Sequence, residues 1–171
     1  MTTAPARKYA TPTTGPQTEL GEKVIKIRRV VKVTKGGRTF RFSALVIVGD
    51  RKGQVGFAVG KAREIPVAIT KAIARARKTM VRVPIVNTTV PHQNKGHFGA
   101  SCVLIKPASL GVGIIAGGAA RAVVQLAGYQ NIYTKSFGSN TAHNLIAATI
   151  SGLASMKVPR RAATPAVTPG S

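Results

Sequence analysis

Acidic side chains are almost absent from this sequence, which holds 4 Asp or Glu against 26 Lys or Arg in 171 residues. All four lie at or before Glu64, so residues 65–171 carry 12 cations and no carboxylate side chain. This half of the chain has no paired carboxylates for acid–base catalysis and no oxygen ligands for a hard cation. The formal net charge is +22, and so many positive side chains repel one another unless a polyanion is near. The composition therefore favours a protein that binds nucleic acid over an enzyme that acts on a small molecule.

Cysteine and long apolar runs are also scarce. Cys102 stands alone, which excludes an internal disulfide and suits a reducing cytosol. No apolar run reaches the length of a membrane span, and no signal peptide opens the sequence, so we expect a cytoplasmic protein without a membrane partner. The hydrophobic fraction of 44% is enough to fill the cores of one or two small domains.

Residues 25–59 show the period-two alternation of half-buried strands. The alternation predicts three successive strands, and turns follow from Lys35-Gly36-Gly37-Arg38 and from Asp50-Arg51-Lys52-Gly53. The period then becomes helical from Pro66 onward. The apolar positions of the three strands are Ile25, Ile27, Val31, Val33, Phe40, Phe42, Ala44, Val46, Val48, Val55, Phe57 and Val59.

Cations crowd this β-β-β-α stretch. Seventeen Lys or Arg lie between Lys23 and Arg82, against only Asp50 and Glu64. The predicted helix carries a basic stripe of Lys71, Arg75, Lys78 and Arg82, which on most helices is simply a solvated face. Here there are almost no acids with which such a face could pair, so phosphate is the expected counter-charge.

The second half predicts the order β-β-α-β-α. We expect extended segments at Ile85–Pro91 and Ser101–Lys106, joined by a polar loop over His92–Gly99. A helix over Gly117–Ala127 that stops at Gly128, a strand over Asn131–Ser136 and a helix over Asn140–Met156 should follow. The domains are therefore expected at 22–82 and 83–157. Residues 1–21 and 158–171 are expected to be disordered tails, with a transit peptide as the alternative for the first.

Two groups of residues suggest other kinds of site. Gly111-Val112-Gly113-Ile114-Ile115-Ala116 matches the dinucleotide fingerprint, but Asn131 stands where an acid would hold the ribose. His92, His97 and Cys102 could suggest zinc or a Cys-His nucleophile. Only His143 remains as a fourth ligand, and no acid is available to orient a catalytic histidine. We therefore expect no cofactor, no metal and no catalytic residue.

The sequence resembles bacterial small-subunit ribosomal protein five over roughly residues 20–157. The matching motifs of the first half are Gly37-Arg38, Phe42, Ala44, Val48-Gly49-Asp50, Gly53, Val55-Gly56-Phe57, Gly60-Lys61-Ala62-Arg63-Glu64 and Ala68-Ile69. Those of the second half are His92, Gly96, Gly99, Pro107-Ala108, residues 113–118, Arg121-Ala122-Val123, Ala127-Gly128, Gly138-Ser139, Asn144, Ala148-Thr149 and Gly152-Leu153. Val112, Gln125, Asn131 and Ala142 depart from the residues usual in the family.

The resemblance implies an α+β protein of two small two-layer domains, the first similar to a double-stranded RNA-binding domain without its opening helix. It implies a structural constituent of the small ribosomal subunit that binds ribosomal RNA, stabilises head relative to body and supports translational accuracy. The implied protein partners are small-subunit proteins four and eight. A free nucleic-acid binder or chaperone with the same basic surface is the alternative.

From the charges and the resemblance together we predict two sets of site residues. The predicted RNA-binding residues are Lys26, Arg28, Arg29, Lys32, Lys35, Gly36, Gly37, Arg38, Arg41, Arg51, Lys52, Lys61, Arg63, Lys71, Arg75 and Lys78. The predicted protein interface, implied by the resemblance, comprises Gly113, Gly117, Gly118 and Arg121.

Overall fold

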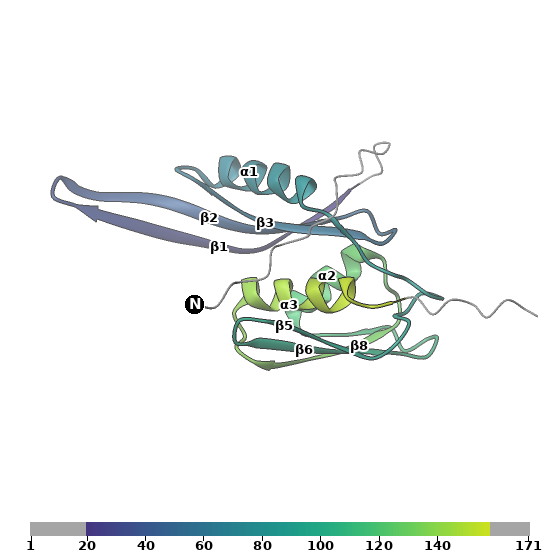
Figure 1. Cartoon of the computed structure of the whole chain (residues 1–171). Coiled ribbons are helices and arrows are strands. Elements are labelled where there is room, and N and C mark those ends of the chain that lie inside the picture. Colours follow the sequence, from purple (N-terminus) through teal and green to yellow (C-terminus); the bar gives the residue numbers. More distant parts are fainter. Residues whose placement is uncertain (1–19, 158–171) are drawn as a thin grey trace, which may run out of the picture.

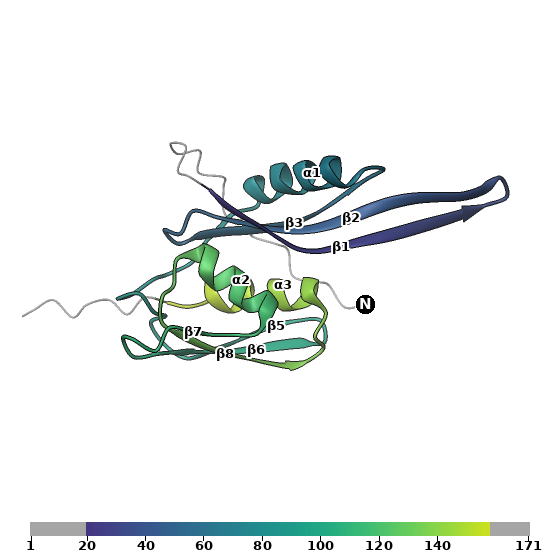
Figure 2. The ribbon, with the colours of Figure 1, turned by 180° about the vertical axis from the view of Figure 1, so that it is seen from behind.

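The computed structural model describes residues 20–157, which form four stacked layers. One helix covers a first sheet, two helices lie on the other side of that sheet, and a second sheet completes the stack (Figure 1). The same order of layers is visible from behind (Figure 2). The two predicted tails, 1–21 and 158–171, lie almost entirely outside the described residues.

The first sheet has the order β1-β2-β3-β4 with antiparallel neighbours. Its strands are β1 (Gly21–Thr34), β2 (Gly37–Gly49), β3 (Gln54–Ala62) and the short β4 (Val81–Arg82), and α1 (Ile65–Lys78) packs on one face. The three predicted strands and the helix are confirmed, with Pro66 in the first helical turn. The strand β4 was not predicted, because two residues carry no periodic signal.

Small residues bring α1 close to its sheet. Ala68, Ala72 and Ala76 form the buried stripe of the helix, and they meet Ala44, Val46 and Val48 of β2. A Cβ on Gly60 would collide with the Ala68 carbonyl, and one on Gly56 would collide with the Ala76 carbonyl. The helix can therefore lie directly on the backbone of β3, where larger residues would hold it away.

The second sheet has the order β5-β6-β8-β7 and carries both remaining helices on one face. Its strands are β5 (Asn94–Phe98), β6 (Ser101–Pro107), β7 (Ile114–Ile115) and β8 (Ile132–Gly138), and its helices are α2 (Gly118–Ala127) and α3 (Ala142–Ala154). The crossover from β7 through α2 to β8 makes the only parallel pairing among the described strands. The prediction of two α+β units is confirmed.

Two predictions for the start of the second unit were wrong, namely the loop at His92–Gly99 and the extended segment at Ile85–Pro91. The first contains β5, whereas the second holds only an isolated bridge between Val86 and Thr89. The strand β5 lies at a sheet edge, where polar residues are tolerated, and Gly96 lets it meet the Ala148 carbonyl of α3. Hydrophobic alternation cannot reveal a strand whose buried position is a glycine.

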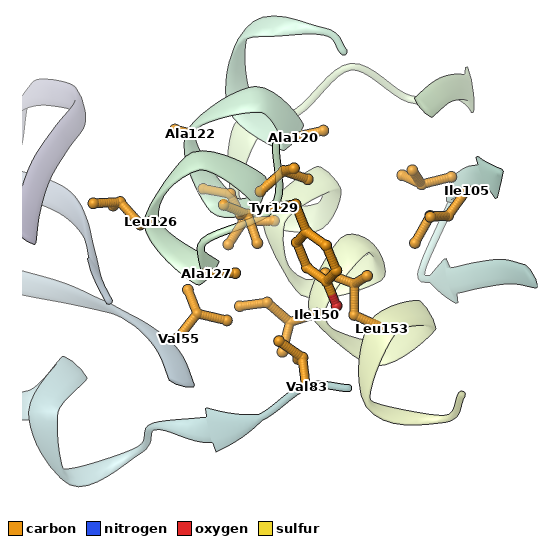
Figure 3. Packing of buried hydrophobic residues seen from close by; sticks show 14 of the residues in the cluster. Val55, Val83, Ile105, Ala120, Ala122, Leu126, Ala127, Tyr129, Ile150 and Leu153 are labelled. Carbon is orange, nitrogen blue, oxygen red and sulfur yellow. The ribbon is translucent and has the colours of Figure 1, made fainter. Parts of the chain in front are cut away.

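The two units share one hydrophobic core. Leu45, Ile47 and Val55 point away from α1 and join the same buried cluster as Val123, Leu126 and Leu153. Val55 lies beside Leu126 and Ala127 at this junction (Figure 3). The second half of β2 is therefore buried on both faces, since its even positions from 44 to 48 lie under α1 and its odd positions join the cluster shared with the second unit, where α2 contacts β2.

Backbone hydrogen bonds reinforce this junction. The amides of Arg51 and Gly53, in the β2–β3 turn, donate to the carbonyls of Leu126 and Ala127 at 3.0 and 2.9 Å. Those carbonyls belong to the last turn of α2 and have no acceptor role inside the helix. The turn from one unit therefore caps a helix of the other.

A side-chain hydrogen bond holds the segment that follows α2. The Tyr129 hydroxyl donates to the Pro84 carbonyl at 2.8 Å. Burial raises the pKa of this phenol well above its usual range, which keeps the hydroxyl protonated.

Gly128 controls the approach of the turn. It ends α2 with φ +101°, and a Cβ there would collide with the Arg51 carbonyl. We expect Gly128→Ala to lower the free energy of unfolding by about 2 kcal/mol or more, from left-handed strain and the collision, which is roughly 4–8 °C in Tm.

Gly118→Ala is the matched control, because nothing lies within 4 Å of its Cβ position and its φ is not in the left-handed region. We expect its stability to stay within about 0.5 kcal/mol of the wild type in the same thermal and urea titrations. Equal losses in the two variants would show that the junction is not under steric control at Gly128.

Candidate nucleic-acid interface

The hairpin of β1 and β2 extends far beyond the helix that covers its base (Figure 1). A 14-residue helix is about 21 Å long, whereas 14 residues of strand span about 46 Å, so α1 covers less than half of β1. Residues 26–41 form this projecting arm, and almost every side chain in it is exposed. The arm carries seven cations and no acid.

One face of the arm, here called the basic face, consists of Lys26, Arg28, Lys32 and Arg41. The cross-strand register pairs Lys26 with Leu45, so these residues share the side of the sheet that meets the second unit. All four side chains are exposed. Their cross-strand neighbours Ser43, Val30 and Thr39 are uncharged, and none of the four cations has a counter-ion among residues 20–157.

The opposite face, here called the apolar face, consists of Ile27, Val31, Val33 and Phe40, with Arg29 and Arg38 between them. Ile27 pairs with Ala44, which lies under α1, so this face continues the covered side of the sheet. The expectation of half-buried positions was wrong here, because α1 begins at the base of the arm and runs away from it along β3, and Val33 is 70% exposed. The Arg29 guanidinium stacks over the Phe40 ring at 3.8 Å.

The tip of the arm is a two-residue turn of Lys35 and Gly36. Gly37 has φ +131°, so only one glycine of the pair uses a conformation that other residues avoid. The Thr34 hydroxyl donates to the Gly37 carbonyl at 3.2 Å and closes the turn. The tip therefore presents a cation and a bare backbone at the far end of the arm.

A second group of predicted residues meets along the edge of β3. Lys61, Lys71 and Arg75 line a cleft of about 330 Å³, and Arg75 Nη1 donates to the Val59 carbonyl at 3.3 Å. This carbonyl lies on the edge that β4 leaves unpaired, so Arg75 shields the edge from strand addition. Arg63, before α1, and Lys78, at its end, are exposed, and neither lines this cleft.

The Asp50–Gly53 turn lies at the opposite end of the sheet from the arm's tip. The Asp50 carboxylate accepts hydrogen bonds from the amides of Lys52 and Gln54 at 2.7 and 2.8 Å, and Arg51 adopts φ 55°. The backbone of this turn caps α2, while the side chains of Arg51 and Lys52 remain exposed. The basic residues of the two turns therefore do not form one patch.

Arg51 instead lines a larger cleft between the two units. Arg121 of α2, Lys23 of β1 and Gln125 are also in its lining, and the cleft measures about 790 Å³. Lys23 Nζ donates to Gln125 Oε1 at 3.3 Å, which ties the units together. Glu22 at the same rim is paired with Arg77 at 3.0 Å, the only ion pair among residues 20–157. The sequence could not reveal this cleft, because its walls come from different units.

The other predicted interface residues do not line this cleft, and they lie at the start of α2 and in the loop before β7. Gly117 is the N-cap of the helix and Gly118 its first residue, and both are exposed. Gly113 has φ +77° and lies in the loop before β7. A Cβ at any of these three glycines would meet nothing within 4 Å, so the fold itself leaves the surface open.

The glycine loop that matches the dinucleotide fingerprint is occupied by a side chain of the protein. The amides of Gly111 and Gly113 both donate to Asn131 Oδ1 at 3.1 Å, and Asn131 Nδ2 donates to Thr88 Oγ1 at 3.0 Å. A pyrophosphate would need those same amides. Asn131, which is 6% exposed, therefore holds the loop closed. The position at which the fingerprint requires an acid carries an amide side chain, and the fold uses this amide to bind the loop.

The three residues that could suggest a zinc site, His92, His97 and Cys102, do not form one cluster. His97 and Cys102 are cross-strand partners in β5 and β6, but His92 is engaged elsewhere, with Nε2 accepting from the Lys157 amide at 3.3 Å. Within residues 20–157, no three His, Cys, Asp or Glu side chains form a group that could hold a metal. The helices in the same range are all too short or too polar to cross a bilayer.

An α+β body with almost no carboxylates and a projecting basic arm defines a nucleic-acid-binding protein. Two family models match the chain. The N-terminal domain of ribosomal protein S5 matches residues 20–84, and the C-terminal domain of ribosomal protein S5 matches residues 96–165. The chain belongs to the ribosomal protein S5 family. It is a structural, non-enzymatic component of the small ribosomal subunit in the cytoplasm, and it binds ribosomal RNA.

The loop around Asn131 yields a prediction about stability. Removing the side chain with Asn131→Ala leaves two amides without their acceptor, so we expect a loss of about 1–3 kcal/mol in the free energy of unfolding. Asn131→Asp keeps the accepting oxygen and should lose much less. Urea titration of both variants is the measurement. An Asn131→Ala protein as stable as Asn131→Asp would contradict the role given to this amide.

Proposed function

We propose that the chain holds ribosomal RNA mainly through the basic face and the tip of its arm. The observation that carries this proposal is the set of four exposed cations on one face, with no acid anywhere between Lys23 and Gly49. Phosphates spaced along an RNA backbone supply the missing charge. Lys35 extends the same positive potential to the end of the arm, and the bare backbone at Gly36 and Gly37 allows close approach.

The cleft along β3 adds a second RNA contact on the body. Its three cations, Lys61, Lys71 and Arg75, come from a strand and a helix that pack rigidly on each other. Fixed positions lower the conformational entropy lost on binding a phosphate. Arg63, Lys78, Lys52, Arg29 and Arg38 are proposed to contribute at the margins of these two surfaces.

We further propose that the arm and the body contact different parts of the small subunit, and so stabilise its head relative to its body. The arm is long, and it projects from two packed units of the protein that share one core. A rigid protein with a projecting arm resists relative motion of the two RNA segments that it contacts. A free chaperone would gain nothing from this rigidity.

The cleft between the units is proposed to receive another protein of the subunit, small-subunit protein four, with protein eight as a further neighbour. Arg121 and Arg51 face this cleft, and the one carboxylate at its rim is already paired with Arg77. An acidic side chain of a partner would satisfy the free cations. Support for translational accuracy is proposed to act through this contact.

The RNA surface can be tested by charge removal on the basic face. We expect the double variant Lys32→Ala, Arg41→Ala to bind protein-free small-subunit ribosomal RNA more weakly. The slope of log affinity against log salt should fall by roughly 0.7–0.9 for each phosphate that the variant no longer neutralises. Both side chains are exposed, so the thermal unfolding curve should not change. The proposal fails if the slope of the variant equals that of the wild type.

The protein contact can be tested with Arg121→Ala, which avoids placing an acid beside Lys23 and Arg51 in the same cleft. Loss of a desolvated interfacial charge should weaken the contact by about 2–5 kcal/mol and raise stop-codon readthrough in cells. Affinity for protein-free RNA should change little.

Lys135→Ala is the matched control, because Lys135 is exposed on β8 and lies outside the cleft. It should leave readthrough unchanged. An RNA-affinity loss for Arg121→Ala as large as that of the basic-face variant would make Arg121 a phosphate contact instead.

A further inference from the structure

The apolar face of the arm has no partner within the described protein. Ile27, Val31 and Phe40 are each between 42% and 46% exposed, and Val33 is 70% exposed. They lie in register on two neighbouring strands, with Val31 directly opposite Phe40. A continuous strip of this kind usually marks a binding site and not an accident of the surface.

Charge restricts what can cover this strip. Arg29 and Arg38 lie between the apolar side chains, and neither forms an ion pair among residues 20–157. The opposite side of the same two-stranded ribbon carries four more cations. A partner must therefore combine flat apolar surface with regular negative charge, which is the chemistry of RNA with unpaired bases.

The stack of Arg29 on Phe40 supports the same ligand. Aromatic rings and guanidinium planes are the surfaces on which proteins stack unpaired bases. Here one of each is already joined at 3.8 Å on an exposed strand surface, so the stack is formed before RNA arrives. Val31 and Val33 extend the platform toward the tip with side chains that lose little entropy on contact.

A two-stranded ribbon with ligands on both faces cannot lie on one RNA helix. The major groove of A-form RNA is too deep and narrow for side chains to read, and a helix contacts only one face of the ribbon. We infer that the arm is inserted between two RNA segments, with phosphates on the basic face and unpaired nucleotides stacked on the apolar face. This inference rests on the proposed function of the arm in binding RNA.

The test compares two matched double variants of the full chain on protein-free small-subunit ribosomal RNA. Val31→Thr, Phe40→Thr removes apolar surface, keeps strand-forming residues and leaves every charge in place. We expect its affinity to fall about tenfold or more, with an unchanged salt slope, because stacking releases no counter-ions. Lys32→Ala, Arg41→Ala should instead lower the slope.

Phe40→Tyr serves as the conservative variant. It keeps an aromatic ring for stacking, so its affinity should remain close to that of the wild type. Thermal unfolding of all variants checks that the body is intact. If Phe40→Tyr binds as weakly as the threonine variant, the ring is not a stacking surface and the inference fails.

The two proposals fail in different ways. Wild-type affinity in the apolar-face variant, together with a reduced slope in the basic-face variant, overturns the inference and leaves RNA binding by the arm intact. Wild-type behaviour in both variants overturns both. A photoreactive phenylalanine analogue at position 40 in assembled subunits gives an independent readout. Crosslinks to an unpaired nucleotide support the inference, and crosslinks to protein alone overturn it.

Discussion

Burial of the second half of β2, residues 44–49, on both of its faces is the constraint on which the rest of the structure depends. Val46 lies under α1 and Ile47 lies over the helices of the second unit, so one strand belongs to two cores. The Arg51 and Gly53 amides then cap the last turn of α2 and fix the distance between the units. Without this junction the cleft around Arg121 would have one wall, and the arm would have no fixed direction relative to the second sheet.

The same junction explains how so basic a chain can fold without many ion pairs. Most positive charges lie on the arm, on the outer side of α1 and at the cleft, with others such as Lys135 on the second sheet, while the two cores contain no charged side chain. Helices approach strands through Ala and Gly, so packing stabilises the body, and residues 20–157 contain only the ion pair of Arg77 with Glu22. The unpaired cations are then free to contact RNA, whose phosphates relieve the self-repulsion of the protein.

Local patterns predicted most of the elements for identifiable reasons. Alternation predicted β1, β2 and β3, Pro66 predicted the start of α1, and Gly128 predicted the end of α2. The strand β5 was missed because Gly96 occupies its buried position and polar residues surround it. The exposure of Val31 and Val33 was missed for a different reason, since alternation shows that a strand has two unlike faces but not whether either of them is covered.

The sequence by itself determined that the protein is basic, that it has no carboxylates for catalysis in its second half and that it consists of two α+β units. These properties depend on composition and on patterns that repeat within a few residues. The tertiary structure alone decided that Asn131 closes the glycine loop, that Arg51 lies across a cleft from Arg121 and that the arm has one basic and one apolar face. Each of these depends on contacts between residues distant in sequence, or on how far a 14-residue helix extends over a longer hairpin, and no local pattern encodes such distances.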